Sequence, residues 1–256
     1  INVGLVGSEM CIRDSTSCGA CVEQCPLFID QMGKILEMRR FLTMEGKLTG
    51  TAVRTLQKLG SHGNPWGFEA TDRAPWAKEN EVPVLGNGAG DNAEDFDVIF
   101  WTGCFGAFDP RGQEVATTIT DLMKEAGVKF AIMGPNETCS GDPARRLGEE
   151  ALFQELAMTN VGTMKGFNVK KVIANCPHCF NTLKNEYPDF GSDVEVVSHT
   201  EYLNSLIKEG KLNPTKNIDE EITYHDPCYL GRHNKILDEP RAVSYTHLTL
   251  PTKVSV

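Results

Sequence analysis

Residues 170–187 read KKVIANCPHCFNTLKNEY, and this stretch joins a predicted strand to a cysteine pair and a helix. The apolar run before Cys176 is typical of a buried strand, and the segment from Pro177 onward has the composition of a helix. Cys176 ends the strand, and Cys179 lies one turn into the helix. The sequence therefore predicts that a strand delivers this cysteine pair to the start of a helix.

The same alternation continues on both sides of this stretch. Further strands are predicted at 97–103, 128–134, 193–200 and 221–228, with helices at 110–127, 142–164 and 201–212. Strands that alternate with helices indicate a parallel sheet covered on both faces. We therefore predict an α/β fold, a parallel sheet with flanking helices, for residues 96–243.

The segment before this domain does not show the alternation of strands and helices. Helical spacing over 27–48 and 50–59 predicts a small helical unit at residues 16–60, with Arg39 and Arg40 on the solvent side. Residues 61–95 are rich in glycine and proline and are predicted to be a linker.

Charge and cysteine content restrict the class of protein. The chain has 256 residues and a net charge of −10, which argues against nucleic acid as a partner. No apolar run approaches the ~18 residues of a membrane span. The nine cysteines occur without a recognisable export signal. In a reducing cytosol, clustered cysteines are metal ligands or catalysts more often than disulfides.

Five cysteines follow predicted strands of the α/β region: Cys104, Cys139, Cys176, Cys179 and Cys228. The carboxyl ends of parallel strands share one edge of the sheet, and ligands bind there. Helix N-termini at that edge favour negative charge, such as that of a thiolate-ligated cluster. We expect the first four of these thiols to lie together.

The N-terminal region carries a second cysteine motif, Cys18-x2-Cys21-x3-Cys25-Pro26. A bacterial ferredoxin run reads C-x2-C-x2-C-x3-C-P, and Ser15 stands where its first cysteine would fall. Zinc sites usually pair two such units or add histidines, and none is close in the sequence. The spacing therefore favours iron–sulfur, with Cys25 serving a different cluster from Cys18 and Cys21.

Two other interpretations stay open. A strand followed by C-x-x-C at a helix start is also the arrangement of thioredoxin-like enzymes, so Cys176 and Cys179 could form a thiol–disulfide oxidoreductase. A zinc-stabilised, non-enzymatic scaffold is the second alternative. His178 and His225 sit beside cysteines, but their turn and helix-start positions need no ligand role. No acid/base pair or catalytic nucleophile is evident.

The assembled motifs resemble the iron–sulfur oxidoreductases related to heterodisulfide reductase. The motifs are CGACVEQCP, WTGC, ETCSGDPARR, CPHCFNTLKNEYP and YHDPCYLGRHN. Members of this family have a two-cluster ferredoxin segment followed by two cysteine-rich CCG domains. The resemblance implies that Cys104, Cys139, Cys176 and Cys179 match the cluster ligands of the first repeat, and that Cys228 matches the first ligand of the second.

The resemblance also implies a function and partners. Family members carry electrons through 4Fe-4S clusters, often from a flavoprotein towards a quinone or disulfide acceptor. Many are integral to the membrane or bound to its inner face. We therefore expect an electron-transfer component that is cytoplasmic or at the inner face of the plasma membrane, associated with the membrane through parts missing from this chain.

The chain departs from the family pattern in three ways. Ser140 follows Cys139 where the repeat usually has a second cysteine, which puts an unusual five-thiol cluster in doubt. The second repeat stops after Cys228, and the ferredoxin segment is incomplete. Residues 1–15 and 244–256 resemble translated adapter sequence, which predicts non-native ends, an accidental Cys11 and a truncated fragment that is inactive alone.

Overall fold

A parallel sheet of four strands, in the order β2-β1-β3-β4, organises the molecule. The computed structural model describes residues 12–27, 29–86, 90, 92–215 and 223–245. The strands are β1 (Val98–Trp101), β2 (Phe130–Ile132), β3 (Lys171–Ala174) and β4 (Glu195–Ser198). Ile99 in β1 pairs with Ala131 on one side and Val172 on the other. The predicted α/β fold is confirmed.

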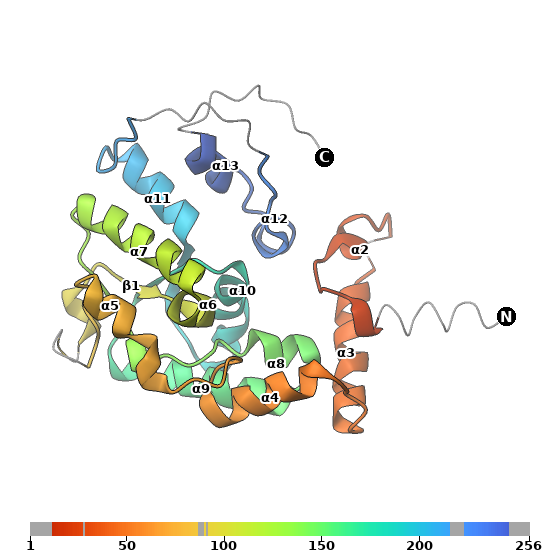
Figure 1. Cartoon of the computed structure of the whole chain (residues 1–256). Helices are drawn as coiled ribbons and strands as arrows, with labels where there is room; N and C mark the ends of the chain where they lie inside the picture. The colour runs from red at the N-terminus through yellow and green to blue at the C-terminus, as the bar shows by residue number, and fades with distance from the viewer. Residues whose placement is uncertain (1–11, 28, 87–89, 91, 216–222, 246–256) are drawn as a thin grey trace.

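Successive strand residues point to opposite faces of the sheet. Because the strand residues on both faces are apolar, helices cover both faces. The helices are α6 (Gly103–Phe108), α7 (Pro110–Glu125), α8 (Asp142–Leu147), α9 (Glu150–Gly166), α10 (Pro177–Asn181) and α11 (His199–Lys208). Ile99 and Trp101 share a buried cluster with α9 residues, whereas Val98 and Phe100 share one with α7 residues. Figure 1 shows α7 and α11 on one side of the sheet and α8 and α9 on the other.

The helix predicted over 142–164 is divided at Gly148. Gly148 is the C-cap of α8 and has a left-handed backbone, with φ +89°. This conformation ends a helix because it satisfies the last carbonyl groups, and glycine adopts it without a side-chain clash. The division turns α9 back along the sheet while α8 stays near the strand ends.

Residues 61–95 were expected to be a linker, and the structure packs them into the α/β domain instead. They form η1 (Ala70–Arg73), α5 (Pro75–Glu79) and η2 (Ala93–Asp95). Trp76, Val82 and Leu85 are buried in the core clusters. Val84 makes a parallel bridge with Ile132 of β2, so this segment borders the edge of the sheet.

The N-terminal helices are α2 (Ala20–Glu23), α3 (Gln31–Met44) and α4 (Thr51–His62). Arg39 was predicted on the solvent side, and this is wrong, because the side chain is only 9% exposed. Its guanidinium donates to the carbonyl oxygens of Ile12 at 2.6 Å and Arg146 at 2.9 Å. Arginine can be buried here because these acceptors, with those of Arg13 and Ser15, satisfy its donors.

The fifth strand predicted over 221–228 is not found in its described part. Residues 223–227 are irregular, and helix α12 (Cys228–Asn234) begins at the cysteine. Pro227 precedes that helix as its N-cap and has no N–H to donate to a strand ladder. Helix α13 (Asp238–Tyr245) follows. The predictions for residues 1–11, which include Cys11, and for 246–256 lie outside the described residues.

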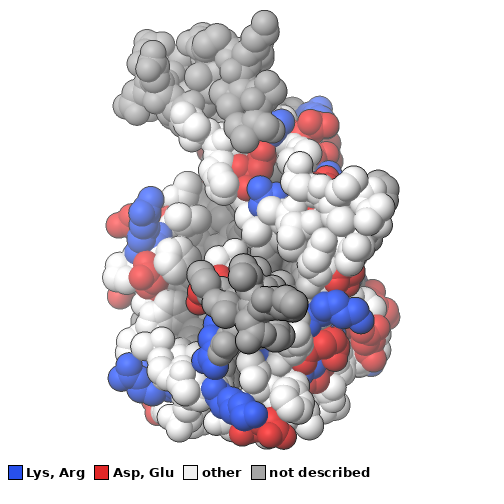
Figure 2. Space-filling view, turned by 90° about the vertical axis from the view of Figure 1, so that its right-hand side faces the viewer, with Lys and Arg blue, Asp and Glu red and all other residues white. Residues whose placement is uncertain are grey.

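The surface and the helix lengths bear on possible partners. In the described ranges, no helix is both long enough and apolar enough to cross a lipid bilayer. Figure 2 shows lysine and arginine interspersed with aspartate and glutamate on the face that it presents.

Candidate functional site

The carboxyl edge of the sheet brings four cysteines from separate parts of the chain together. Cys104 lies in α6 just after β1, and Cys176 and Cys179 lie at the start of α10 just after β3. The strand order places β1 and β3 side by side on either side of the point where the chain reverses its direction of winding. In open parallel sheets, ligands bind in the crevice at this position.

Several contacts connect the four thiols. Cys104 hydrogen-bonds Cys139, and Cys176 hydrogen-bonds Cys179. The two pairs adjoin each other, because Cys179 interacts electrostatically with Cys139. A Cβ on Gly103, next to Cys104, would lie 3.5 Å from the Cys179 sulfur. These interactions place the four cysteines near one another at the carboxyl edge of the sheet.

Cys139 lies outside any helix or strand, and hydrogen bonds to its backbone fix its position. Its N–H donates to the Gly63 carbonyl at 2.7 Å, and its own carbonyl accepts from the Asn160 side chain at 3.0 Å. The Tyr187 hydroxyl donates to the Ser140 carbonyl at 3.0 Å. Asn160 and Tyr187 are fully buried, so the Cys139–Ser140 peptide is fixed from two sides.

Ser140 faces the same site. Its hydroxyl donates to the Cys179 sulfur at 3.5 Å, and the residue is 1% exposed. The position after Cys139 therefore points at the thiols and not at solvent. A cysteine there would add a fifth sulfur to the group.

Within each cysteine pair, a hydrogen bond between the two thiols lowers the pKa of one cysteine and raises the pKa of the other. A hydrogen bond from Cys179 lowers the pKa of Cys176 to about 6. The same bond, together with burial, raises the pKa of Cys179 well above its usual range. Likewise, the pKa of Cys104 is lowered, chiefly by Cys139, and that of Cys139 is raised. Cys104 and Cys176 are therefore the more acidic thiol of each pair.

Two further residues of the site were not identified from the sequence. Arg73 donates to the Cys104 sulfur at 3.1 Å and pairs with Glu137 at 2.9 Å. Arg73 lies in the segment predicted to be a linker, where no local pattern marks it. Glu137 lies two residues before Cys139 in the ETCSGDPARR motif, so its position in the sequence was suggestive.

The four thiols are a donor set that iron–sulfur clusters use. Within the described ranges, no three histidine, cysteine or acidic side chains are arranged to hold one metal ion. Thiolates that bind a cluster attach to different irons and need not converge on a point, and four cysteines are the usual ligands of a 4Fe-4S cluster. The four thiols at the sheet edge therefore fit such a group.

The N-terminal cysteines lie beside α12. Cys18 and Cys25 are half-buried, and Cys21 is exposed. His233 of α12 contacts the Ser17 carbonyl at 3.0 Å, and Lys235 pairs with Glu23 at 2.5 Å. These contacts join the ferredoxin-like stretch to the α/β domain.

Three aromatic rings form a continuous column between the two groups of cysteines. His178, which lies between Cys176 and Cys179 in the sequence, has its ring centroid 4.1 Å from that of Tyr229. Tyr229 stacks on His233 with centroids 4.2 Å apart and an interplanar angle of 5°. The column therefore begins beside the cysteine pair of α10 and ends at the backbone before Cys18.

Cys228 does not join the four-thiol group through any contact that the described residues show. It is the first residue of α12, and Arg232 donates to its sulfur at 3.1 Å. Arg232 also interacts electrostatically with Cys18, where it contributes to a lowered pKa that is due mainly to the Ala20 N–H. Cys228 thus lies towards the N-terminal cysteines.

Replacing Tyr229 by alanine should release the N-terminal cysteine stretch. The ring is 2% exposed, and its loss leaves His178 and His233 without a common partner, at a cost of about 3 kcal/mol. Mass spectrometry after brief alkylation should show Cys18 labelled several-fold faster, with Cys139 still protected. Tyr202→Ala, at the opposite end of the sheet, is the matched control. Equal labelling of Cys18 in both variants would contradict the role of the column.

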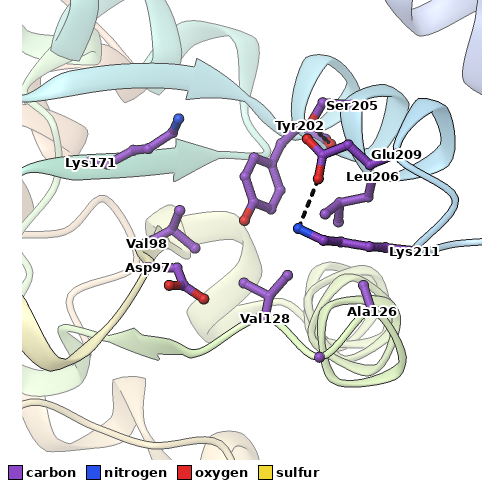
Figure 3. A pocket seen from close by; sticks show the side chains of 11 residues that line it. Asp97, Val98, Ala126, Val128, Lys171, Tyr202, Ser205, Leu206, Glu209 and Lys211 are labelled. Atoms are coloured by element: carbon purple, nitrogen blue, oxygen red, sulfur yellow. Dashed lines mark hydrogen bonds and ion pairs between the residues drawn. The ribbon is translucent and has the colours of Figure 1, made fainter.

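Two cavities of the described residues lie away from the cysteines. One of about 260 Å³ opens at the amino ends of the strands and is lined by residues that include Asp97, Lys171 and Tyr202 (Figure 3). Lys211 pairs with Glu209 at 2.8 Å on its rim. A second cavity, lined in part by Leu42 and Leu147, lies between the N-terminal helices and α8. Neither contains a cysteine.

The chain is similar to several known proteins. The sequence profile described as "Cysteine-rich domain" (CCG) matches residues 98–184. The chain is 42% identical over 245 residues to the "Probable iron-sulfur-binding oxidoreductase FadF" of Bacillus subtilis, covering 94% of this chain and 35% of the relative. It is 43% identical over 240 residues to the "EtfAB:quinone oxidoreductase" of Syntrophomonas wolfei, covering 93% and 34%.

A third relative is more distant. One subunit of the "Dihydromethanophenazine:CoB--CoM heterodisulfide reductase" of Methanosarcina mazei is 31% identical over 239 residues, covering 91% of this chain and 56% of the relative. No solved structure matches the chain significantly. The chain spans about a third of the first two relatives. Residues 98–184 are a cysteine-rich domain of the CCG type, and the chain is related to the iron–sulfur oxidoreductases of the heterodisulfide reductase group.

Proposed function

We propose that this chain is the electron-carrying part of an iron–sulfur oxidoreductase, and that Cys104, Cys139, Cys176 and Cys179 hold a 4Fe-4S cluster. The observation that carries the proposal is the meeting of these four thiols, which follow three different strands, at the carboxyl edge of the sheet. A cluster bound there supplies one-electron transfer without acid/base chemistry, in keeping with the lack of a recognisable acid/base pair in the sequence.

The chain's own residues would set the conditions for that transfer. Cys104 and Cys139 are 8% and 4% exposed, so the site excludes most water around these sulfurs. Burial and hydrogen bonds to sulfur are the terms by which proteins adjust the potential of a cluster. Ser140 would supply such a hydrogen bond to Cys179, in the place where a fifth cysteine would otherwise stand. A cluster with four cysteine ligands suits this chain better than one that needs five.

The N-terminal cysteines would belong to two ferredoxin-type clusters. Cys18 and Cys21 would serve one, and Cys25 the other. Among the described residues, this stretch supplies these three thiols. Cys228, which lies towards them, is proposed as the first ligand of a second cysteine-rich repeat. We propose the boundaries 16–60, 61–95 and 96–243 for the ferredoxin-type unit, the connecting segment and the cysteine-rich domain, although residues 61–95 share the core of that domain.

The partners follow from the chemistry of the relatives. One relative is named for electron transfer between EtfAB and quinone, and another for reduction of a heterodisulfide. We propose that electrons enter this protein from a flavoprotein and leave towards a quinone or a disulfide. The rings of His178, Tyr229 and His233, which contact one another in turn, lie between the N-terminal cysteines and the four-thiol site, which suits a relay between the two.

A second function is favoured by one observation, the low pKa of Cys176 beside a protonated Cys179. A thiol–disulfide oxidoreductase needs such an attacking thiolate at a helix start. The two functions differ in their products: the redox enzyme would reduce a model disulfide without iron, whereas the electron carrier would not.

Anaerobic reconstitution tests the main proposal. The purified chain, supplied with iron and sulfide, should bind about four irons per chain and turn brown, because the sheet-edge site offers four thiols. Iron and sulfide analysis with a visible spectrum gives the result. A colourless protein that takes up zinc instead would contradict the proposal and favour the scaffold interpretation.

A further inference from the structure

Arg73 is a buried arginine whose role neither the fold nor the cysteine motifs explain. It is 3% exposed and lies at the end of η1, outside the segment matched by the cysteine-rich profile. One nitrogen of its guanidinium donates to the Cys104 sulfur at 3.1 Å, and the other pairs with the Glu137 carboxylate at 2.9 Å. The face of the Phe108 ring lies 5.0 Å from the guanidinium carbon.

Glu137 fixes the orientation of this guanidinium. Its carboxylate accepts the backbone N–H of Gly103 at 2.9 Å and that of Thr102 at 3.2 Å, and the residue is 2% exposed. Those peptides belong to the turn that also carries Cys104. The carboxylate therefore holds both the arginine and the turn, so the arginine N–H is aimed at the sulfur in a single geometry.

The arrangement requires arginine specifically. A guanidinium presents several N–H groups in one rigid plane and can reach a carboxylate and a sulfur at once. A lysine ammonium is a single point on a flexible stem and would satisfy one partner at the expense of the other. An arginine that served only to neutralise the charge of Glu137 would not need to contact the Cys104 sulfur as well.

The charges at this position act directly on the thiol group. Arg73 also interacts electrostatically with Cys139, so its positive charge lies beside two of the four sulfurs. Adding an electron to a group held by thiolates adds negative charge, which a nearby cation stabilises and a nearby anion opposes. The site is shielded from water, so both effects are stronger than at the surface.

We propose that Arg73 is a positioning residue that raises the reduction potential of the group bound by Cys104, Cys139, Cys176 and Cys179, and that Glu137 holds it in place and moderates its effect. The proposal rests on the iron–sulfur function proposed above. Arg73 would raise the reduction potential and Glu137 would lower it, although the two side chains form one ion pair.

Redox titration of reconstituted protein tests this proposal, with the visible spectrum as the readout. Arg73→Gln should lower the midpoint potential, because the cation and its N–H to the sulfur are lost, and Glu137→Gln should raise it. We expect roughly a tenfold change in the one-electron equilibrium constant in each direction, which corresponds to about 59 mV. Arg54→Gln, at an exposed arginine of α4, is the matched control and should leave the potential unchanged.

The outcomes separate this inference from the function on which it rests. A wild-type chain that forms no iron–sulfur spectrum contradicts the proposed function, and this inference with it. A normal wild-type spectrum with unchanged potentials, or with shifts of the same sign in both variants, overturns the inference alone and leaves Arg73 a structural ion-pair partner. If Arg73→Gln does not fold, Arg73→Lys should fold and still lower the potential, because its ammonium cannot hold both Glu137 and the Cys104 sulfur; an unchanged potential in that variant would also overturn the inference.

Discussion

Replacing Cys176 by alanine should abolish the brown absorbance of the reconstituted chain. Cys176 is the N-cap of α10 and one of only four thiols at the sheet edge, so its loss leaves three sulfurs where a 4Fe-4S cluster needs four. The visible spectrum and the iron content should both fall to the level of the untreated protein. Circular dichroism should show that the fold is kept, because the cysteine side chain is not part of the hydrophobic core clusters.

Cys21→Ala is the matched control for this result. Cys21 is exposed and lies in the N-terminal stretch, outside the proposed four-thiol site. Its replacement should leave the absorbance unchanged, as should replacement of Cys11, which lies outside the described residues. Equal loss in the Cys176 and Cys21 variants would show that the ligand set is wrong.

Replacing Gly148 by alanine should destabilise the protein by more than about 3 kcal/mol. A Cβ at this position would lie 2.5 Å from the carbonyl carbon of Arg39 and 2.6 Å from its oxygen, both atoms of the α3 backbone. The residue also has φ +89°, which an alanine adopts only with strain. Urea unfolding, followed by circular dichroism, measures the change in free energy.

The clash would separate α3 from α8, which are joined at this point. Arg39 donates to the Arg146 carbonyl at 2.9 Å, and the Thr43 hydroxyl donates to the Leu147 carbonyl at 2.9 Å. These bonds satisfy carbonyl groups at the end of α8 that have no partner within the helix.

Gly162→Ala is the control for the Gly148 variant. Gly162 lies within α9, and no atom lies within 4 Å of its Cβ position, so alanine there should stabilise the helix by about 0.5–1 kcal/mol. If both glycine variants unfold at the same urea concentration, the close approach of α8 to α3 does not constrain the fold.

Periodicity in the sequence was sufficient to predict the sheet. Each of β1 to β4 falls within a predicted strand, because a short apolar run ended by a cysteine, glycine or serine can be read locally. The prediction of a fifth strand was wrong, and local composition alone could not show why. Thr223 and its neighbours have strand-like composition, but Pro227 and the start of α12 at Cys228 direct the chain away from the sheet.

The segment before β1 was misjudged because its burial depends on distant partners. Trp76 and Val84 lie in a stretch rich in glycine and proline, yet they pack on strands and helices that come later in the chain. Arg39 was misplaced for a similar reason, since its acceptors come from residues 12–15 and from α8.

The sequence by itself determined the alternation of strands and helices and the positions of Cys104, Cys139 and Cys176 after three of the strands. Parallel strands place their carboxyl ends at one edge, so the meeting of Cys104, Cys139, Cys176 and Cys179 followed from the order of elements alone. Only the tertiary structure decided which other groups surround the sulfurs. Arg73 reaches Cys104 from 31 residues away, and the Tyr229 ring contacts both the His178 and the His233 rings. Such contacts depend on the packing of separate elements, which no local pattern of residues encodes.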